Sequence, residues 1–228
     1  MAETRRFAPW KLIAGGLGLA LLALGLFQAG PAVLLLYAEW GIDPRAPVTA
    51  ESAAAMRAGI RLLVAADDWF GDPRARIRAG LYELRLAEAG DAEGAVDHDG
   101  VARAVADLNA GLARVPADPL AWAALSDGRL VVADRSGAAA ALEASILLGP
   151  NEPELVLSRS TLAVALWPDL DAEGRQLAAT QLRLAWDHDR TAVLALARIG
   201  GNVVPVMAAL EGDPRRFSAL MKALAEQR

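Results

Sequence analysis

The only two histidines of the chain each lie between two aspartates, in Asp97-His98-Asp99 and in Asp187-His188-Asp189. Carboxylate and imidazole groups bind metal ions, so each tripeptide is a candidate metal site. Ligands on adjacent residues nevertheless lack the i, i+4 placement on one helix face that many zinc enzymes use. We therefore interpret Asp99 and Asp189 as N-caps of the helices that follow, and we expect no metal site.

Carboxylates also neighbour one another elsewhere, for example at Asp67 with Asp68 and at Asp169 with Asp171. Such pairs can act in acid–base catalysis, but at helix ends they are more typical of solvated caps. The sequence has no phosphate-binding G-x-x-x-x-G-K-[ST] pattern, no G-x-S-x-G pattern and no cysteine. We expect no catalytic residue, no cofactor and no enzyme activity. The alternative is an enzyme acting on cell-wall or capsule material, which needs carboxylates clustered in a cleft.

Residues 12–36 form an uncharged apolar run of twenty-five residues. This run is long enough to cross a hydrocarbon core of about 30 Å. Trp10 precedes it, and Tyr37 and Trp40 follow it, as expected of aromatic residues at the two membrane surfaces. The sequence therefore predicts a single transmembrane helix over residues 12–36, in contact with the lipid bilayer.

The basic residues of this region lie before the apolar run, at Arg5, Arg6 and Lys11. The positive-inside rule then predicts that residues 1–11 are a cytoplasmic tail and that the remaining chain lies in the periplasm, beyond an inner membrane. A cleaved signal peptide is the alternative, although its apolar core is normally shorter than this one. One face of this helix carries only small residues at four positions, Ala14, Gly18, Gly25 and Ala29. This face either pairs with a second membrane helix or reflects only the Ala/Gly-rich composition of the segment.

After the apolar run, the sequence repeats with a period of thirty-four residues. Asp118-Pro119 recurs as Glu152-Pro153, and both pairs offer an acidic N-cap followed by proline at the first helical position. Asp72-Pro73 and Asp213-Pro214 give the same helix-start signal. These joints between alanine-rich segments predict an all-α fold.

The segment between the joints has its apolar and small residues at fixed places. Trp122, Leu125 and Ser126 share one stripe of a first helix, and Pro150 closes the unit after a second helix. The second helices carry a small, a large and a small residue in series, at Ala104, Leu108 and Gly111, at Ala138, Leu142 and Ser145, and at Ala178, Leu182 and Ala185. This pattern resembles the tetratricopeptide repeat (TPR). Arg129 stands where that family usually has tyrosine.

The resemblance covers residues 73–190 and implies a TPR-like α-solenoid. Its first helix is predicted over residues 73–89, and the glycine-rich segment 90–100 is predicted to be an exposed insertion. Residues 37–72 are then a linker and a lead-in helix at 50–66. Residues 191–228 form capping helices near 191–199, 203–211 and 214–227, the last with inward-facing residues Phe217, Leu220, Met221 and Leu224.

A solenoid of this kind presents a concave face, lined by the first helix of each pair, that binds other proteins. Candidate partner-binding residues on that face are Arg76, Arg129 and Arg159. The alternative is that these three are solvated surface arginines without a partner protein. A third repeat begins at Pro153 and is interrupted at Trp167-Pro168. Trp167 and Trp186, which flank this interrupted part, are either anchors for a partner or packing residues. Residues 1–11 carry a net charge of +2, which leaves −7 for the rest of the chain. We expect no nucleic-acid partner, because this charge repels phosphates.

Residues 147–197 carry two further distinctive runs, Leu-Trp-Pro-Asp-Leu-Asp at 166–171 and Gln-Leu-Arg-Leu-Ala-Trp at 181–186. They are similar to membrane-anchored TPR accessory proteins of bacterial exopolysaccharide biosynthesis, the VpsP-like group. The resemblance implies a scaffold that assists polysaccharide polymerisation or export, with membrane or periplasmic proteins of that machine as partners. The alternative is an assembly or chaperone adaptor of another envelope system, such as cytochrome c maturation.

Overall fold

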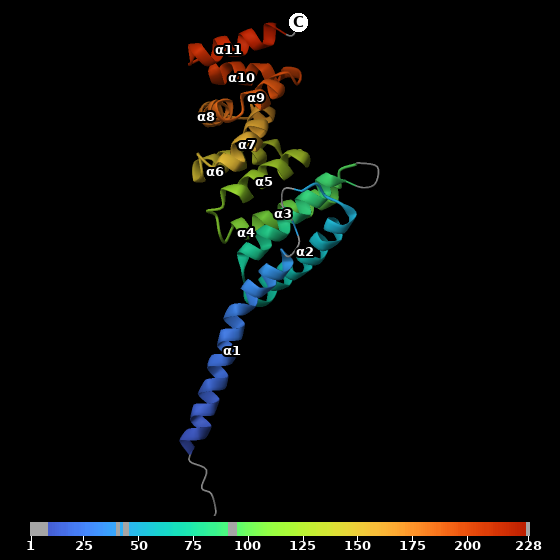
Figure 1. The fold of residues 1–228 in the computed structure, drawn as a ribbon, viewed down its shortest axis with the longest axis vertical. Helices are drawn as coiled ribbons and strands as arrows, with labels where there is room; N and C mark the ends of the chain where they lie inside the picture. Colours follow the sequence, from blue (N-terminus) through green and yellow to red (C-terminus); the bar gives the residue numbers. More distant parts are fainter. Residues whose placement is uncertain (1–8, 40–41, 43–45, 91–94, 227–228) are drawn as a thin grey trace, which may run out of the picture.

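The computed structural model describes residues 9–39, 42, 46–90 and 95–226. Within these residues the chain forms eleven α-helices and one short 3-10 helix, and it contains no β-strand (Figure 1). The expected all-α class is therefore confirmed. Most of the predicted tail, the interfacial Trp40 and part of the predicted insertion at 90–100 lie outside the described residues.

Helix α1 (Pro9–Ala38) extends alone beyond the rest of the molecule (Figure 1). Its segment Gly16–Ala38 is long and apolar enough to cross a membrane, by length and composition. All residues from 16 to 29 are exposed. The predicted span 12–36 lies inside this helix, and residues 9–11 of the predicted tail belong to the helix as well.

Helix α2 (Ala50–Phe70) packs between α1 and α3 (Pro73–Ala89). It begins with a capping box, in which Thr49 and Ser52 each satisfy the other's backbone N–H. It ends at Gly71, whose φ of 67° is the left-handed conformation that glycine adopts without strain. The lead-in helix thus runs four residues beyond the predicted end at residue 66.

The following helices pack largely as consecutive pairs. Helix α3 packs on α4 (His98–Leu112), α5 (Pro119–Val131) on α6 (Arg135–Leu148), and α7 (Pro153–Leu166) on α8 (Ala172–His188). Helices α9 (Arg190–Ala197), α10 (Val203–Leu210) and α11 (Pro214–Ala225), with the 3-10 helix Gly200–Asn202, complete the described chain.

Acidic residues stand at the N-caps of most of these helices, as the sequence predicts. The carboxylates of Asp72, Asp118 and Asp213 accept hydrogen bonds from backbone N–H groups in the first turns of α3, α5 and α11. Glu152 occupies the N-cap of α7 without such a bond from its side chain. The proline after each of these four residues lies at the first helical positions, where its missing N–H costs nothing.

The two Asp-His-Asp tripeptides differ in which aspartate caps a helix. Asp189 caps α9, with its carboxylate 2.9 Å from the backbone nitrogen of Ala192, as predicted. The N-cap of α4 is Asp97, which accepts a hydrogen bond from the backbone nitrogen of Gly100 at 2.9 Å. The prediction of Asp99 as that cap is wrong, because the helix already begins at His98.

Small residues let the paired helices approach closely. A Cβ added to Gly80 on α3 would lie 2.8 Å from Leu108 Cγ and 3.0 Å from the carbonyl oxygen of Ala104 on α4. The small-large-small series predicted for α4, α6 and α8 is buried at all nine positions. The predicted helix faces are therefore confirmed for these three second helices.

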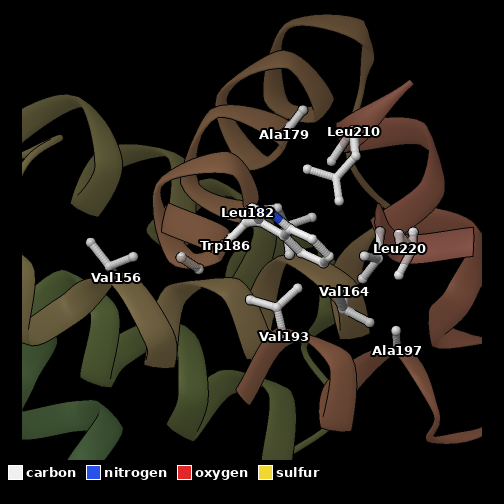
Figure 2. Packing of buried hydrophobic residues seen from close by; sticks show 12 residues of the cluster. Val156, Val164, Ala179, Leu182, Trp186, Val193, Ala197, Leu210 and Leu220 are labelled. Carbon is white, nitrogen blue, oxygen red and sulfur yellow. The ribbon is translucent and has the colours of Figure 1, made fainter. Parts of the chain in front are cut away.

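The C-terminal part of the chain has a core of its own between α7 and α11 (Figure 2). Leu182 and Trp186 of α8 meet Val164 of α7, Leu210 of α10 and Leu220 of α11 in this core. Leu220 is buried, and Phe217 and Leu224 are half-buried, as predicted. Met221 is 42% exposed, so the prediction that it faces inward is wrong.

Candidate functional site

Alternate helices of the chain line a groove. One hollow of about 630 Å³ lies between α3, α5 and α7, and a second of about 720 Å³ lies between α3, the start of α5 and the connection that follows α1. The two hollows share Leu81, Arg85 and Leu120, so they form one continuous groove. None of the described lining residues belongs to α4, α6 or α8.

The floor of the groove is apolar. Leu155 and Leu162 from α7 are buried, and Leu81 from α3 is half-buried. Leu120, where the two hollows meet, is 49% exposed. A large apolar side chain left half in water at the centre of a groove favours contact with another molecule, because covering it removes apolar surface from water.

Two carboxyl groups face each other at one end of the groove, Glu88 from α3 and Asp127 from α5. Burial, the charge of Asp127 and a hydrogen bond between the two groups raise the pKa of Glu88 to about 7. Burial also raises the pKa of Asp127, against the opposing effect of its hydrogen bond with Glu88. The pair therefore shares a proton near neutral pH. The carboxyl oxygens of this pair can accept hydrogen bonds from a ligand. While one of the two groups is protonated, it donates that proton in the hydrogen bond between Glu88 and Asp127.

The other end of the groove has more arginines than carboxylates in its lining. Arg78 forms an ion pair with Glu39, and Arg85 donates a hydrogen bond to the carbonyl oxygen of Ala46. These contacts fasten the connection between α1 and α2 onto α3. Burial raises the pKa of Tyr82 between these arginines, whose charges oppose that rise. The groove thus runs from guanidinium groups near α1 to carboxyl groups near α7.

The structure does not bring the predicted partner-binding arginines into this groove. Arg76 lies on α3 but forms ion pairs with Asp67 and Asp68, both at 3.0 Å, and with Asp107 at 3.2 Å. Burial lowers the pKa of Arg76, but its hydrogen bond to Asp67 and the charges of Asp107 and Asp67 outweigh this effect and raise the pKa. Arg76 therefore ties α3 to α2 and α4.

Arg129 likewise contacts its own chain. It donates hydrogen bonds to the carbonyl oxygen of Gly137 at 2.9 Å and to Asn109 Oδ1 at 2.8 Å, and it lies 3.7 Å from Asp134. These contacts join α5 to α4 and to the start of α6. Arg129 thus holds this joint by hydrogen bonds.

The prediction that Arg159 lies on an exposed inner face is wrong, because its side chain is fully buried. Its guanidinium donates to Ser145 Oγ at 2.9 Å and to the carbonyl oxygens of Ser145 at 2.7 Å and Gly149 at 2.6 Å. Burial lowers the pKa of Arg159, whereas the charge of Glu152 raises it. Arg159 lies at the end of α6, where its positive charge and its donors complement the carbonyl groups of the last turn.

The two tryptophans pack within the molecule. Trp167 is half-buried between the cores on either side of it, and its carbonyl oxygen accepts a hydrogen bond from Arg175 at 3.2 Å. Trp186 is 6% exposed, and the guanidinium of Arg190 lies 4.9 Å above its ring. This placement favours the packing interpretation over the anchoring one.

The carboxylate pairs noted in the sequence also engage their own chain. Asp67 forms ion pairs with Arg76 and with Arg114, the latter at 2.6 Å, and is 11% exposed, so it is not a solvated cap. Asp171 is the N-cap of α8, and Asp169 pairs with Arg135 at 2.6 Å. No three His, Cys, Asp or Glu side chains gather into a metal-binding cluster among the described residues.

Sequence reasoning missed the groove residues Glu88, Asp127 and Leu120. Leu120 directly follows Asp118-Pro119, so the sequence does indicate a leucine in the first turn of a helix. Glu88 and Asp127 are thirty-nine residues apart rather than thirty-four, so the repeat period alone does not pair them. Comparisons of the chain with protein-family models, with curated proteins and with solved structures found no match.

Proposed function

We propose that this protein is a membrane-anchored, TPR-like scaffold that docks a protein partner in the groove between α3, α5 and α7. The observation that carries the proposal is the lining of this groove, which comes from alternate helices and leaves Leu120 half-exposed at its centre. In stacked helix pairs, the first helices line the binding face and the second helices form the outer face.

The packing order supports a solenoid. Each pair of helices contacts mainly the pair before it and the pair after it, and the close approach at Gly80 corresponds to the small-residue contact expected within a repeat. The helices after α8 cover the end of the stack, which a repeat array needs in order to bury its last apolar face (Figure 1).

The chemistry of the groove indicates what it accepts. The apolar floor suits a segment with large apolar side chains, and the opposite charges at the two ends favour one direction of binding. A basic or hydroxyl-bearing end of that segment would meet Glu88 and Asp127, and an acidic end would lie near the arginines at the α1 side.

The anchor and the pathway belong to the same proposal. A single span through α1, with the amino terminus in the cytoplasm, holds the groove in the periplasm and raises its effective concentration for membrane partners. The similarity of residues 147–197 to exopolysaccharide accessory proteins favours partners from a polysaccharide polymerisation or export machine.

Site-specific photo-crosslinking of the full chain in cells tests the docking groove. A photoreactive amino acid replaces Leu120 in the groove in one strain and Leu147, which is 64% exposed on α6, in a matched control strain. We expect a specific adduct from position 120 that is absent from position 147 and that disappears when Leu155 at the groove floor is changed to Asp. A reporter fused to the carboxyl terminus identifies the side of the membrane.

The adducts are identified by mass spectrometry. Capture of polysaccharide polymerase, flippase or chain-length proteins supports the assigned pathway, whereas capture of cytochrome-maturation or secretion proteins keeps the scaffold and overturns the pathway. Equal adducts from positions 120 and 147, or none from position 120, overturn the docking groove. A cytoplasmic reporter signal overturns the periplasmic placement.

A further inference from the structure

The carboxyl end of α2 lies beside α1 well before the end of that helix. The rings of Phe70 on α2 and Phe27 on α1 are 5.3 Å apart between centroids, with a tilted geometry. Gly30 provides the space for the Phe70 ring, because an added Cβ there would lie 2.5 Å from its Cζ atom. Helix α2 thus runs back along α1 toward the membrane.

The same packing continues to the end of α1. Leu34 and Leu35 of α1 pack against buried Leu63 and Ala66 of α2. At the end of α1, a Cβ added to Gly59 of α2 would lie only 2.7 Å from the carbonyl oxygen of Ala38. One side of α1 is therefore covered by protein from Phe27 to Ala38, whereas residues 16–26 are exposed.

Charged residues accompany this end of α2. Asp67, Asp68 and Arg76 form one group of ion pairs, which Arg114 extends through Asp67. Asp72 and Arg74 follow at the start of α3. If the hydrocarbon core reached Leu36, as the apolar run alone suggests, it would also enclose these three carboxylates and three guanidinium groups. Charged groups in the hydrocarbon core are costly, so the core has to end near Phe27 and Gly30.

The length of the remaining helix agrees with this boundary. Residues 12–29 are eighteen residues and measure about 27 Å along the axis, within the usual range for a spanning helix. Gln28 then lies at the membrane surface, where its amide can bind water. At the opposite end, Trp10 and Lys11 fall at the other surface, where both residue types are favoured.

Trp69 stands at the level of this boundary and is 73% exposed, although it is large and apolar. An indole ring beside a membrane helix is favoured in the headgroup layer, because the ring is apolar and its N–H needs a polar partner. We propose that the turn between α2 and α3, residues 67–74, sits in the headgroup layer with Trp69 as its anchor. Residues 30–38 of α1 then form a stem outside the hydrocarbon core.

This inference rests on the proposed membrane span of α1 and goes beyond it, because it assigns a lipid-contacting surface to the body of the protein. Arg74, Arg76 and Arg114 together balance the three carboxylates of the turn, so the contact does not depend on anionic lipid and can form with any common lipid. Glu39, at the α1 side of the groove, lies nine residues beyond Gly30, or about 14 Å along the axis. The groove therefore opens close to the membrane surface.

Spin labels at single cysteines measure these depths directly, because the chain has no cysteine of its own. Full-length variants Ala20→Cys, Tyr37→Cys, Trp69→Cys and Ile199→Cys are labelled with a nitroxide and reconstituted into phosphatidylcholine vesicles. Collision with dissolved oxygen and with a water-soluble nickel chelate reports depth at each label. Ile199, 64% exposed near α9, is the matched aqueous control for an exposed apolar residue.

We expect the label at residue 20 to meet oxygen and almost no chelate, and the label at residue 69 to meet the chelate several-fold less than the labels at 37 and 199. Added salt should leave the value at 69 unchanged. If the label at residue 69 meets the chelate as often as the label at 199 while residue 20 is still in lipid, the lipid contact of the turn alone is overturned. If the label at residue 37 meets the chelate less than the label at 69, the proposed end of the hydrocarbon core near Phe27 and Gly30 is overturned. Full chelate access at residue 20 overturns the membrane span itself, and this inference with it.

Discussion

At the scale of single residues, Arg159 joins three helices through one side chain. Its guanidinium on α7 bonds Ser145 and Gly149 at the end of α6, and Ser145 Oγ in turn donates to the carbonyl oxygen of Pro119 at the start of α5, at 2.6 Å. The neutral Arg159→Leu variant loses all three donors, so the carbonyl oxygens of Ser145 and Gly149 keep only their backbone N–H partners, at 3.3 Å each. We expect it to lower the free energy of unfolding by about 3 kcal/mol.

Thermal unfolding of the full chain in detergent, followed by circular dichroism, measures this loss. Arg159→Lys keeps the charge but not the planar set of donors, so it should fall between the wild type and Arg159→Leu. Arg198→Leu, at an exposed arginine, is the control and should change little. An Arg159→Leu variant as stable as this control would contradict the structural role.

The Glu88–Asp127 pair gives the stability of the protein a dependence on pH. The pKa of Glu88 rises from 4.5 to about 7, so the folded protein binds this proton more tightly than the unfolded chain does. Stability from this group is complete below about pH 4.5 and is lost as the pH rises to about 7. Because solvent still reaches part of the Glu88 side chain and screens its interaction with Asp127, we expect the loss to stay below about 1 kcal/mol.

Glu88→Gln removes this loss, so its melting temperature should fall less than that of the wild type between pH 4.5 and pH 7. Melting scans at half-unit pH steps provide the comparison. The exposed Glu211→Gln, at the end of α10, is the control and should keep the wild-type slope. An unchanged slope in Glu88→Gln would show that the pair does not share a proton.

Residue-scale prediction from sequence succeeded where the cause is local. The carboxylates of Asp118 and Asp213 cap helices because they precede a proline and reach the next free N–H groups. The sequence did not predict the bonds that Arg76, Arg129 and Arg159 make within the chain, because a helix position fixes the direction of a side chain but not which groups lie in that direction. Their partners Asp67, Asn109 and Gly149 lie outside their own helices, nine to twenty residues away in sequence.

At the scale of elements, the bounds of the helices were largely predictable. Helix α3 spans Pro73–Ala89 as predicted, since Asp72-Pro73 starts it and Gly90 follows its last residue. The start of α4 was misplaced by two residues, because Asp97 and Asp99 both offer a capping carboxylate and only the structure decides between them. Local signals of this kind locate a helix to within a residue or two.

Glycine at the contact of α3 and α4 is a testable feature of this element pair. A Cβ added to Gly111 would lie 2.5 Å from Ile77 Cγ1 and 3.0 Å from its backbone nitrogen, so the two helices would have to separate. We expect Gly111→Ala to lower the free energy of unfolding by about 1–3 kcal/mol, against the gain of up to about 1 kcal/mol in helix propensity.

Chemical unfolding followed by tryptophan fluorescence measures this change. Gly201→Ala, where an added Cβ meets nothing within 4 Å, is the control and should be close to neutral. A stabilised Gly111→Ala protein would mean that α3 and α4 do not approach as closely as the structure has them.

At the scale of the whole molecule, the pairing of helices was accessible from the repeat, but the groove was not. The longer connection between α3 and α4 lengthens the spacing between α3 and α5, so the residues that meet across the groove do not follow the thirty-four-residue period. The apolar run of α1 likewise extends past the point where α2 begins to cover it, since Leu34 and Leu35 pack against protein. Composition alone cannot separate lipid-facing from protein-facing leucine.

The junction of α1 with α2 decides whether α1 and the body of the protein move as one unit. Gly59 meets the backbone carbonyl of Ala38, and a backbone atom cannot rotate away as a side chain can. Gly59→Val should therefore force α1 off α2 at a cost of about 1–3 kcal/mol, which lowers the ratio of docked to undocked α1 by roughly 5- to 150-fold. Ala54→Val adds a branched side chain at an exposed position of α2 and should leave the junction intact.

Pulsed electron paramagnetic resonance between nitroxides at residues 20 and 106, on α1 and α4, measures this coupling in vesicles. Ala106 is exposed, so its label does not disturb the core. We expect one narrow distance distribution in the otherwise wild-type protein and in Ala54→Val, and a broad one in Gly59→Val. A broad distribution in all three proteins would mean that α1 is already detached. In the proposed membrane placement, the groove would then have no fixed height above the bilayer, and the proposed membrane partner would reach it only by diffusion of a tethered body.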